Sequence, residues 1–269
     1  METVKSYEDI GKLEKNRIEG NPEITNSVIS FKGENNVLYC EGNVKLVGAN
    51  LSFEANNSIV YLSSAQYSQY SFNLIIYNDS TFFIGRNNNL SSPININIQE
   101  NQNVIIGSDC SISSGVNIRT SDIHPIYDNH SKNRINHAKS VFIGDHVWIG
   151  HLAYVSKGVK IGSGAIVENY SFLPHDYTVR SNTIVMGNPA KTIQENIFFV
   201  KEFLGYHNAE HSLNSNEYKS DVFIYEFVNR ETLDMNKIDE IIKSLDVESR
   251  LEFIQKLFVR NKRNNRFTI

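Results

Sequence analysis

The sequence predicts an all-β solenoid, a parallel β-helix of hexapeptide repeats, because aliphatic residues return at every sixth position over residues 143–185. The anchors of this repeat are Ile143, Ile149, Val155, Ile161, Val167, Leu173, Val179 and Val185. Four residues after most anchors the side chain is small or β-branched, at Val147, Ala153, Val159, Ala165, Ser171 and Thr183, and only Tyr177 is bulky. A helix and an alternating strand both lack this period, so the repeat itself defines the fold.

The period of six also predicts the shape of one coil. An inward aliphatic residue every six positions makes three flat faces with about eighteen residues per turn. Gly144, Gly150 and Gly162 each follow an anchor directly, where the chain turns and a side chain would crowd the next coil.

The N-terminal half carries a weaker form of the same pattern. Residues 1–21 are expected to form a cap with a short amphipathic helix over 7–18. From residue 22 to about 103 the chain is rich in Asn and Ser and holds short β-favouring runs. Asn35 and Asn57 precede two of these runs, and Asn tolerates the left-handed backbone of a corner. We interpret this half as degenerate coils of the solenoid; a separate antiparallel β-domain is the alternative.

The regular spacing breaks once, between the anchors Ile118 and Ile143. The stretch from about 123 to 136 does not fit the coil and is expected to leave it as a loop. It is polar, it contains a proline, and it carries His124 and His130. Loops raised from rigid scaffolds are where chemistry concentrates.

The pattern changes again after Val185. A cluster of helix and strand breakers at 186–191 is expected to end the β-helix domain, which we place at residues 22–193. Residues 194–269 form a C-terminal, mostly helical extension, with helices predicted at 193–204, 235–245 and 247–259 and Asp246 as an N-cap. Capping the solenoid ends is their expected role.

Composition excludes several classes of protein. The net charge of −4 and the pI of about 6.1 favour no nucleic-acid partner, and the basic tail at 260–266 is expected to be a solvated end. Cys40 and Cys110 have no disulfide or zinc spacing, so neither a disulfide framework nor a metal is expected. No apolar run suits a secretory signal or a membrane span, so we expect a cytoplasmic protein, with peripheral association at the inner membrane left open.

The six-residue repeat resembles the left-handed β-helix of the hexapeptide acyltransferases. The loop motif Ser121-Asp-Ile-His-Pro125, followed by Trp148 in Gly-Asp-His-Val-Trp-Ile-Gly, looks like the active-site pair of sugar O-acetyltransferases. It is similar to the maltose and galactoside acetyltransferases and to enzymes that acetylate sialic acid or bacterial capsules. The resemblance implies that the solenoid is left-handed, that His124 is the general base, and that Trp148 shapes the acceptor and pantetheine site.

The chemistry supports His124 independently. A sugar hydroxyl is not ionised at neutral pH, so its proton must leave in the transition state to a base that titrates near pH 7, and imidazole is that base. His130 in the same loop is the competing candidate. Asp122 either orients the imidazole or forms an Asx-turn. A thioester donor is already activated, so no cysteine nucleophile is required.

The resemblance also implies acetyl-CoA as the acetyl donor and a homotrimer with active sites at subunit interfaces. Coenzyme contacts carried over from the family fall on Trp148, Gly150, His151, Asn169, His175 and Lys191. The family usually has Ser at the position of His151 and Lys or Thr near His175. Lys191 offers a charge for a phosphate, and an oxyanion donor is expected near Gly150 or His151.

A metal-dependent reaction is a competing hypothesis, since His146 and His151 have the ligand spacing of the γ-class carbonic anhydrases. When the local motif Ile-Gly-His is aligned, however, the first histidine of that pair falls on His151, the second falls on Ser156, and the third zinc ligand falls on Gly115. Two of the three ligands are missing, so no metal site is expected, and His146 is expected to be a coil-surface residue. Further hypotheses are acetylation of a small sugar, a nucleotide-sugar amine or an antibiotic, and a non-catalytic solenoid. The preferred hypothesis is an O-acetyltransferase that acts on a saccharide hydroxyl, of sialic acid or a capsular or surface polysaccharide.

Overall fold

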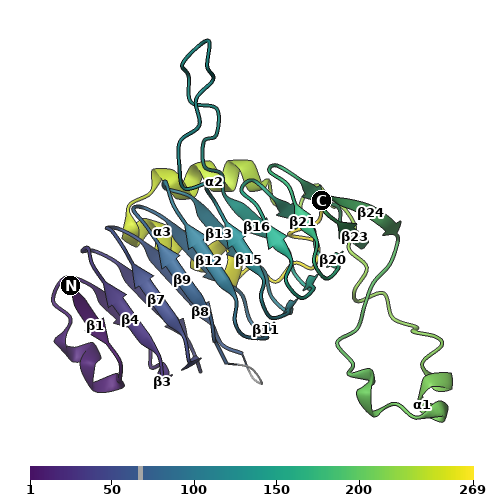
Figure 1. The fold of residues 1–269 in the computed structure, drawn as a ribbon. Helices are drawn as coiled ribbons and strands as arrows, with labels where there is room; N and C mark the ends of the chain where they lie inside the picture. Colours follow the sequence, from purple (N-terminus) through teal and green to yellow (C-terminus); the bar gives the residue numbers. More distant parts are fainter. Residues whose placement is uncertain (66–68) are drawn as a thin grey trace.

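The computed structural model describes residues 1–65 and 69–269 and shows a parallel β-solenoid (Figure 1). The first sheet contains β1 (Glu2–Val4), β4 (Val28–Phe31), β7 (Asn50–Phe53), β9 (Asn73–Ile76), β12 (Asn95–Ile98), β15 (Asn117–Arg119), β18 (Tyr154–Val155) and β21 (Phe172–Leu173). The second contains β2 (Arg17–Glu19), β5 (Val37–Glu41), β8 (Ile59–Ser63), β10 (Thr81–Ile84), β13 (Asn103–Ile106), β16 (Val141–Ile143), β19 (Lys160–Ile161) and β22 (Thr178–Val179).

The third side of the prism has a short pair of strands and then a longer sheet. The pair is β3 (Glu23–Thr25) and β6 (Lys45–Val47). The third sheet contains β11 (Asn89–Leu90), β14 (Ser111–Ile112), β17 (Trp148–Ile149), β20 (Ile166–Val167), β23 (Thr183–Gly187) and β24 (Ala190–Glu195). The predicted β-helix of hexapeptide repeats is confirmed.

The coils have two lengths. In the N-terminal half each strand residue pairs with a residue about 22 positions later, as Leu74 does with Ile96. In the C-terminal half the offset is 18, as between Val155 and Leu173. The longer coils explain why the hexapeptide period is lost before residue 104. Apart from β1, which pairs antiparallel with β4, the N-terminal half is nevertheless parallel and stacked in the same three-sided way, so the hypothesis of an antiparallel β-domain is wrong.

The anchors form one continuous core along the axis. All eight of the anchors from Ile143 to Val185 are buried, and they belong to a cluster that reaches back to Val4. Each anchor stacks on its equivalent in the coil below. Every layer of apolar side chains is therefore shielded from water by the layers on both sides of it.

The corners are closed by the residues that the sequence indicated. Asn35 and Asn57 have φ angles of 57° and 59°, and the Asn35 side-chain amide donates to the Asn57 side chain at 2.8 Å. A Cβ on Gly150 would lie 2.5 Å from the amide nitrogen of Asn169 in the next coil, a contact that no side chain tolerates.

The N-terminal helix is shorter than predicted. A 3₁₀ helix spans Tyr7–Lys12, and the chain then turns into β2, whose Ile18 pairs with Leu38 in the second sheet. Ladder pairing with the next coil therefore overrides the helical pattern beyond residue 12.

The predicted helix at 193–204 is wrong. β23 and β24 form an antiparallel hairpin, with Met186 opposite Lys191, and residues 196–203 continue without helix. The hairpin satisfies the hydrogen bonds of an otherwise open sheet edge, which accounts for strand in place of helix. A 3₁₀ turn at Leu204–Tyr206 and the short α1 (Ala209–Asn214) follow, in the part of the chain that extends away from the solenoid (Figure 1).

Two of the C-terminal helices agree with the prediction. α2 spans Met235–Ser244 and α3 spans Val247–Ile254, and the latter continues as a π-helix over Gln255–Val259. The side chain of Asp246 accepts a hydrogen bond from the Ser249 amide and is the N-cap of α3, as expected.

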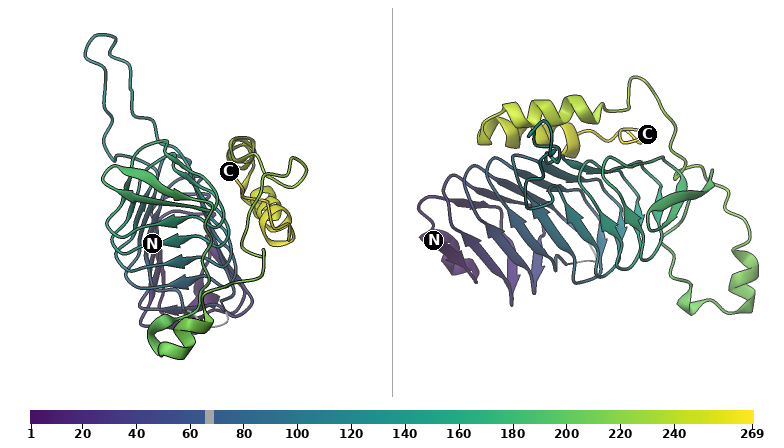
Figure 2. Two further views of the ribbon diagram at one scale, coloured as in Figure 1. Left: turned by 90° about the vertical axis from the view of Figure 1, so that its right-hand side faces the viewer. Right: turned by 45° about the horizontal axis from the view of Figure 1, so that its top comes forward.

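The expected role of these helices as end caps is wrong. They lie along the outer face of the second sheet, parallel to the long axis of the solenoid (Figure 2). That face presents large apolar side chains, including Tyr61, Phe83 and Phe142, which pack with Ile242 and Ile254. A row of outward apolar residues this long requires a cover, and the helices supply it.

The basic tail is solvated at Arg260, Lys262 and Arg263, as expected, but not at its last arginine. Arg266 is buried, and its Nε and Nη2 atoms each lie 2.7 Å from a carboxylate oxygen of Asp145 at a solenoid corner. Within the described residues, no helix is long and apolar enough to cross a membrane.

Candidate active site

The chain leaves the solenoid between β15 and β16 as a projecting hairpin (Figure 1). The coil that contains it pairs Ile118 with Val155, an offset of 37 in place of 18. Within the hairpin, the Ile135 amide donates to the Ile126 carbonyl at 2.9 Å, and Tyr127 forms an antiparallel bridge with Arg134. The predicted loop is therefore present.

His124 lies on this hairpin and is exposed to solvent. The side chain of Asn136, on the returning strand, donates to the His124 carbonyl at 2.9 Å and accepts from the Ile126 amide at 2.7 Å. The same Asn136 amide donates to the Asp122 carboxylate at 2.9 Å. These bonds fix the backbone that carries His124. His130 is exposed in the distal turn, where its amide bonds to Asp128.

Asp122 joins the base of the hairpin to the solenoid. Its carboxylate accepts from the Lys157 ammonium at 2.5 Å and lies 3.2 Å from Nε2 of His175. Burial raises the pKa of Asp122, but the bonds from Lys157 and Asn136 outweigh burial, so the net pKa is lowered. The contacts of this carboxylate thus position the loop, and the local turn is made by Ser121, whose hydroxyl accepts from the Ile123 amide at 2.9 Å.

Lys157 is a part of this site that sequence analysis missed. Its side chain is 5% exposed, and its ammonium also donates to the Asn136 carbonyl at 3.1 Å. A lysine at a solenoid corner carries no local signal, because its partner lies 35 residues earlier, on a loop whose direction the sequence does not show.

Trp148 lies on a different side of the prism. It belongs to β17 in the third sheet, between Ser111 and Ile166 in register, and its side chain is 42% exposed. The hairpin of His124 arises at the corner between the first and second sheets. The structure therefore does not bring Trp148 and His124 together within one chain.

Three predicted coenzyme residues gather at the corner between the third and first sheets. The His151 amide donates to the Asn169 side chain at 2.7 Å, and the His151 ring is held by the Ser114 hydroxyl at 2.9 Å. The Gly150 amide donates to the Val167 carbonyl at 2.7 Å. The backbone amides of Gly150 and His151 are thus both hydrogen-bonded within the coils.

The remaining two predicted contacts are separate from this group. His175 lies at the corner of the hairpin, against Asp122, and Lys191 is exposed on β24 at the end of the third sheet. Trp148 and Lys191 share the third sheet with Gly150 and His151 at its corner, whereas His175 shares the corner of His124.

His146 is not the coil-surface residue that sequence analysis expected. Its ring is buried between Phe199 and Phe223, with ring centroids 4.1 Å and 4.0 Å away and planes within 10°. Nε2 bonds to the Phe199 carbonyl at 2.8 Å, and Nδ1 is buried without a partner in the described structure. Burial lowers the pKa of His146 and so favours the neutral form of its ring. Phe199 also lies 5.8 Å from the ring of Trp148.

The two cysteines lie in the core, away from the hairpin. Cys40 and Cys110 are free and buried, and burial raises the pKa of each thiol to about 12, so both stay protonated. Across residues 1–65 and 69–269, no three His, Cys, Asp or Glu side chains gather as a metal site.

Comparison with known proteins agrees with the repeat and the fold. Residues 140–175 match the family model described as bacterial transferase hexapeptide (six repeats). A polysialic acid O-acetyltransferase of Escherichia coli O1:K1 is 38% identical over 84 residues, which are 31% of this chain and 27% of the relative. A chloramphenicol acetyltransferase of Escherichia coli is 40% identical over 65 residues, 24% of this chain and 30% of the relative. Each match spans less than a third of the relative's length.

A solved structure extends the likeness to most of the solenoid. The crystal structure of the polysialic-acid-specific acetyltransferase NeuO aligns with a TM-score of 0.61 at 29% identity, and the alignment covers 74% of this chain and 90% of NeuO. The sequence matches and the fold together show a β-helix of hexapeptide repeats that is similar to the bacterial polysialic acid O-acetyltransferases.

Proposed function

We propose that this protein is an O-acetyltransferase that moves the acetyl group of acetyl-CoA to a hydroxyl of an acidic saccharide, sialic acid or a capsular or surface polysaccharide. The observation that supports it most is the hairpin, which holds an exposed His124 on a backbone fixed by Asn136 and Asp122. The likeness to enzymes that acetylate polysialic acid supports the choice of acceptor. Because acetyl-CoA is the donor, we place the reaction in the cytoplasm or at the inner face of the membrane.

His124 acts as the general base. Acetyl-CoA supplies an acetyl group already activated as a thioester. The acceptor hydroxyl oxygen forms a bond to the acetyl carbon as its proton passes to the imidazole of His124, and the carbon–sulfur bond breaks. The proton on His124 then neutralises the departing thiolate, so the base is restored. A positioned base of this kind contributes about 10²- to 10⁴-fold to the rate.

The positions of the other site residues support a site shared between subunits. Trp148 and Lys191 lie on the third sheet, with Gly150, His151 and Asn169 at its corner, whereas His124 and His175 lie at the opposite corner of the first sheet. Packing of one chain's third sheet against a neighbour's hairpin corner would complete the site. We propose that a homotrimer provides this packing, that the third-sheet group holds the coenzyme, and that Lys191 contacts a phosphate.

Thiol release from acetyl-CoA tests the activity. Pure protein is incubated with acetyl-CoA and a panel of glycans that includes polysialic acid, and free coenzyme A is followed. We expect release with an acidic glycan and a fall of about 10²- to 10⁴-fold in His124→Ala. His130→Ala, in the same loop, is the matched control and should keep its activity. No release with any glycan would reject the proposal, and equal loss in both variants would remove the role of His124.

Mixing variants tests the shared site. His124→Ala and Trp148→Ala are each expected to be inactive, but trimers that contain both chains should regain part of the activity, because some interfaces then combine an intact His124 with an intact Trp148. Light scattering should give about three times 30.7 kDa. Inactive mixed assemblies, or a monomer mass, would reject the shared site.

Chloramphenicol is a second candidate acceptor, favoured by the matching segment of a chloramphenicol acetyltransferase. The same assay distinguishes the two. Release with chloramphenicol and not with any glycan would assign the protein to antibiotic acetylation.

A further inference from the structure

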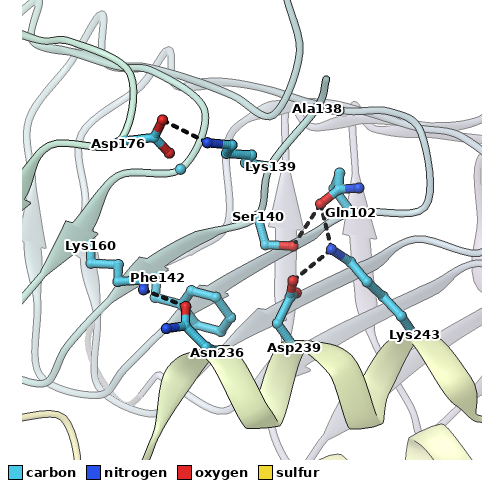
Figure 3. A pocket seen from close by; sticks show the side chains of 11 residues that line it. Gln102, Ala138, Lys139, Ser140, Phe142, Lys160, Asp176, Asn236, Asp239 and Lys243 are labelled. Atoms are coloured by element: carbon cyan, nitrogen blue, oxygen red, sulfur yellow. Dashed lines mark hydrogen bonds and ion pairs between the residues drawn. The ribbon is translucent and has the colours of Figure 1, made fainter. Parts of the chain in front are cut away.

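A pocket of about 280 Å³ lies where α2 meets the corner that carries the hairpin (Figure 3). Asn236, Asp239 and Lys243 of α2 line one side. The other side is lined by solenoid residues, among them Lys160 of β19 and Ser140 just before β16. The pocket thus lies between α2 and the strands of the second sheet that α2 covers.

The pocket carries one positive charge that no carboxylate neutralises. Two of its lysines are paired, Lys139 with Asp176 at 2.7 Å and Lys243 with Asp239 at 2.6 Å. Lys160 instead donates to the neutral Asn236 side chain at 2.6 Å, and no carboxylate of residues 1–65 or 69–269 pairs with it. An ammonium whose partner is a neutral amide rather than a carboxylate can still form a charge-assisted bond to an anion, which is stronger than a bond between neutral groups.

Polar groups around Lys160 are held in place by a network. The Gln102 side-chain oxygen accepts from the Lys243 ammonium at 2.7 Å and from the Ser140 hydroxyl at 3.2 Å. Asp239 accepts from the side-chain amide of Asn103 at 2.8 Å as well as from Lys243. Fixed amides, a hydroxyl and an ammonium together suit a ligand that carries both hydroxyl groups and a carboxylate.

The pocket adjoins the base of the hairpin. Lys139 lies on the segment that returns from the hairpin, and Gly158 and Asp176 of the lining are the neighbours of Lys157 and His175, which hold Asp122. A saccharide bound in the pocket would therefore lie beside the corner from which the hairpin of His124 projects.

We propose that this pocket is a subsite for an acidic sugar unit of the acceptor, with Lys160 bound to its carboxylate. The inference rests on the proposed function for the identity of the ligand. Because α2 forms one side of the pocket, the subsite depends on the C-terminal extension. The extension would then contribute to acceptor selection in addition to covering the second sheet.

Direct binding without acetyl-CoA tests the subsite separately from catalysis. A fluorescent sialic acid oligomer is titrated with the full-length protein, and a carboxyl-reduced oligomer serves as its neutral match. We expect Lys160→Met to weaken binding of the acidic oligomer about tenfold and to leave the reduced oligomer unchanged. Lys237→Met is the control, since Lys237 is an exposed lysine on the same helix and does not line the pocket.

A second variant guards against a folding defect. Asn236→Asp keeps the size of the side chain and places a carboxylate beside Lys160, so it should weaken binding about as much as Lys160→Met. Wild-type protein that does not bind the oligomer, or equal affinity in all variants, would overturn the subsite. If Lys160→Met instead weakens the affinity for free coenzyme A, the pocket holds a phosphate and the proposal is wrong. If the wild-type protein binds the oligomer but transfers no acetyl group to any glycan, the proposed function alone is rejected.

Discussion

The ammonium of Lys157 lies 2.5 Å from the carboxylate of Asp122 and joins a buried solenoid corner to the loop that carries His124. Lys157→Met should lower the free energy of unfolding by about 1–3 kcal/mol, since the carboxylate loses its main partner. Lys139→Met is the matched control: Lys139 pairs with Asp176 at 2.7 Å on the exposed surface and should change stability by less than about 1 kcal/mol. Urea unfolding measures both. Equal effects would show that the buried pair has no special role.

The same carboxylate predicts how the loop responds to acid. The pKa of Asp122 is lower in the folded protein than the unfolded value of about 3.9. Its contribution to stability is therefore complete above that value and is lost as the pH falls through the lowered pKa. Asp122→Asn should remove this part of the acid sensitivity. Hydrogen exchange of the 123–136 backbone, followed from about pH 6 downward, would contradict the prediction if wild type and variant respond alike.

Protonation of His146 is expected to cause a second pH-dependent change, in the segment 196–203 that packs on its ring and is called the strap here. Burial lowers the pKa of His146 below the unfolded value of about 6.5, so its stabilising effect is present above that value and is lost as the pH falls through the folded pKa. Protonation would place a charge between Phe199 and Phe223, with Nδ1 lacking an acceptor among the described residues. We expect the strap to detach in acid.

The measurement uses the single tryptophan of the chain. Trp148 lies 5.8 Å from Phe199, so release of the strap should shift its emission to longer wavelength. His146→Phe cannot be protonated and should keep the emission constant over the same pH range. A shift that persists in this variant would assign the titration to another group.

The ion pair of Asp145 with Arg266 predicts a further loss of stability. Both side chains are largely buried and the contact is bidentate, with two distances of 2.7 Å. Lysine cannot form this fork, so Arg266→Lys should destabilise the protein by about 1–3 kcal/mol and expose the C-terminal segment to protease. Arg263→Lys is the control, because Arg263 is exposed and bonds to the backbone carbonyl of Arg230. Unfolding and limited proteolysis would reveal whether the two differ.

A side chain at Gly150 is expected to lower the stability of the protein, because the solenoid corner has no room for it. A methyl group there would lie 2.5 Å from the Asn169 amide nitrogen, so Gly150→Ala should cost about 1–3 kcal/mol through displacement of the next coil. Nothing lies within 4 Å of a methyl group at Gly11, and Gly11→Ala should leave stability within about 0.5 kcal/mol. Thermal unfolding compares the two, and equal midpoints would contradict the steric argument.

The sequence alone determined the solenoid, the place where a loop leaves it, and the helices α2 and α3. Those features depend on local spacing: buried anchors such as Ile149 recur because each coil repeats the one below, and Asp246 caps α3 through a bond three residues away. The loop of His124 was visible as a break in that spacing, and the left hand of the solenoid came from the family resemblance.

Tertiary structure alone decided what these elements cover and contact. The helices lie on the second sheet because its outward row, which includes Tyr61 and Phe83, requires an apolar cover, and no sequence period shows which face needs one. His146 meets Phe199 and Asp145 meets Arg266 across 53 and 121 residues. Such partners depend on where the chain returns after the solenoid ends, and that path follows from the packing of the extension rather than from the repeat.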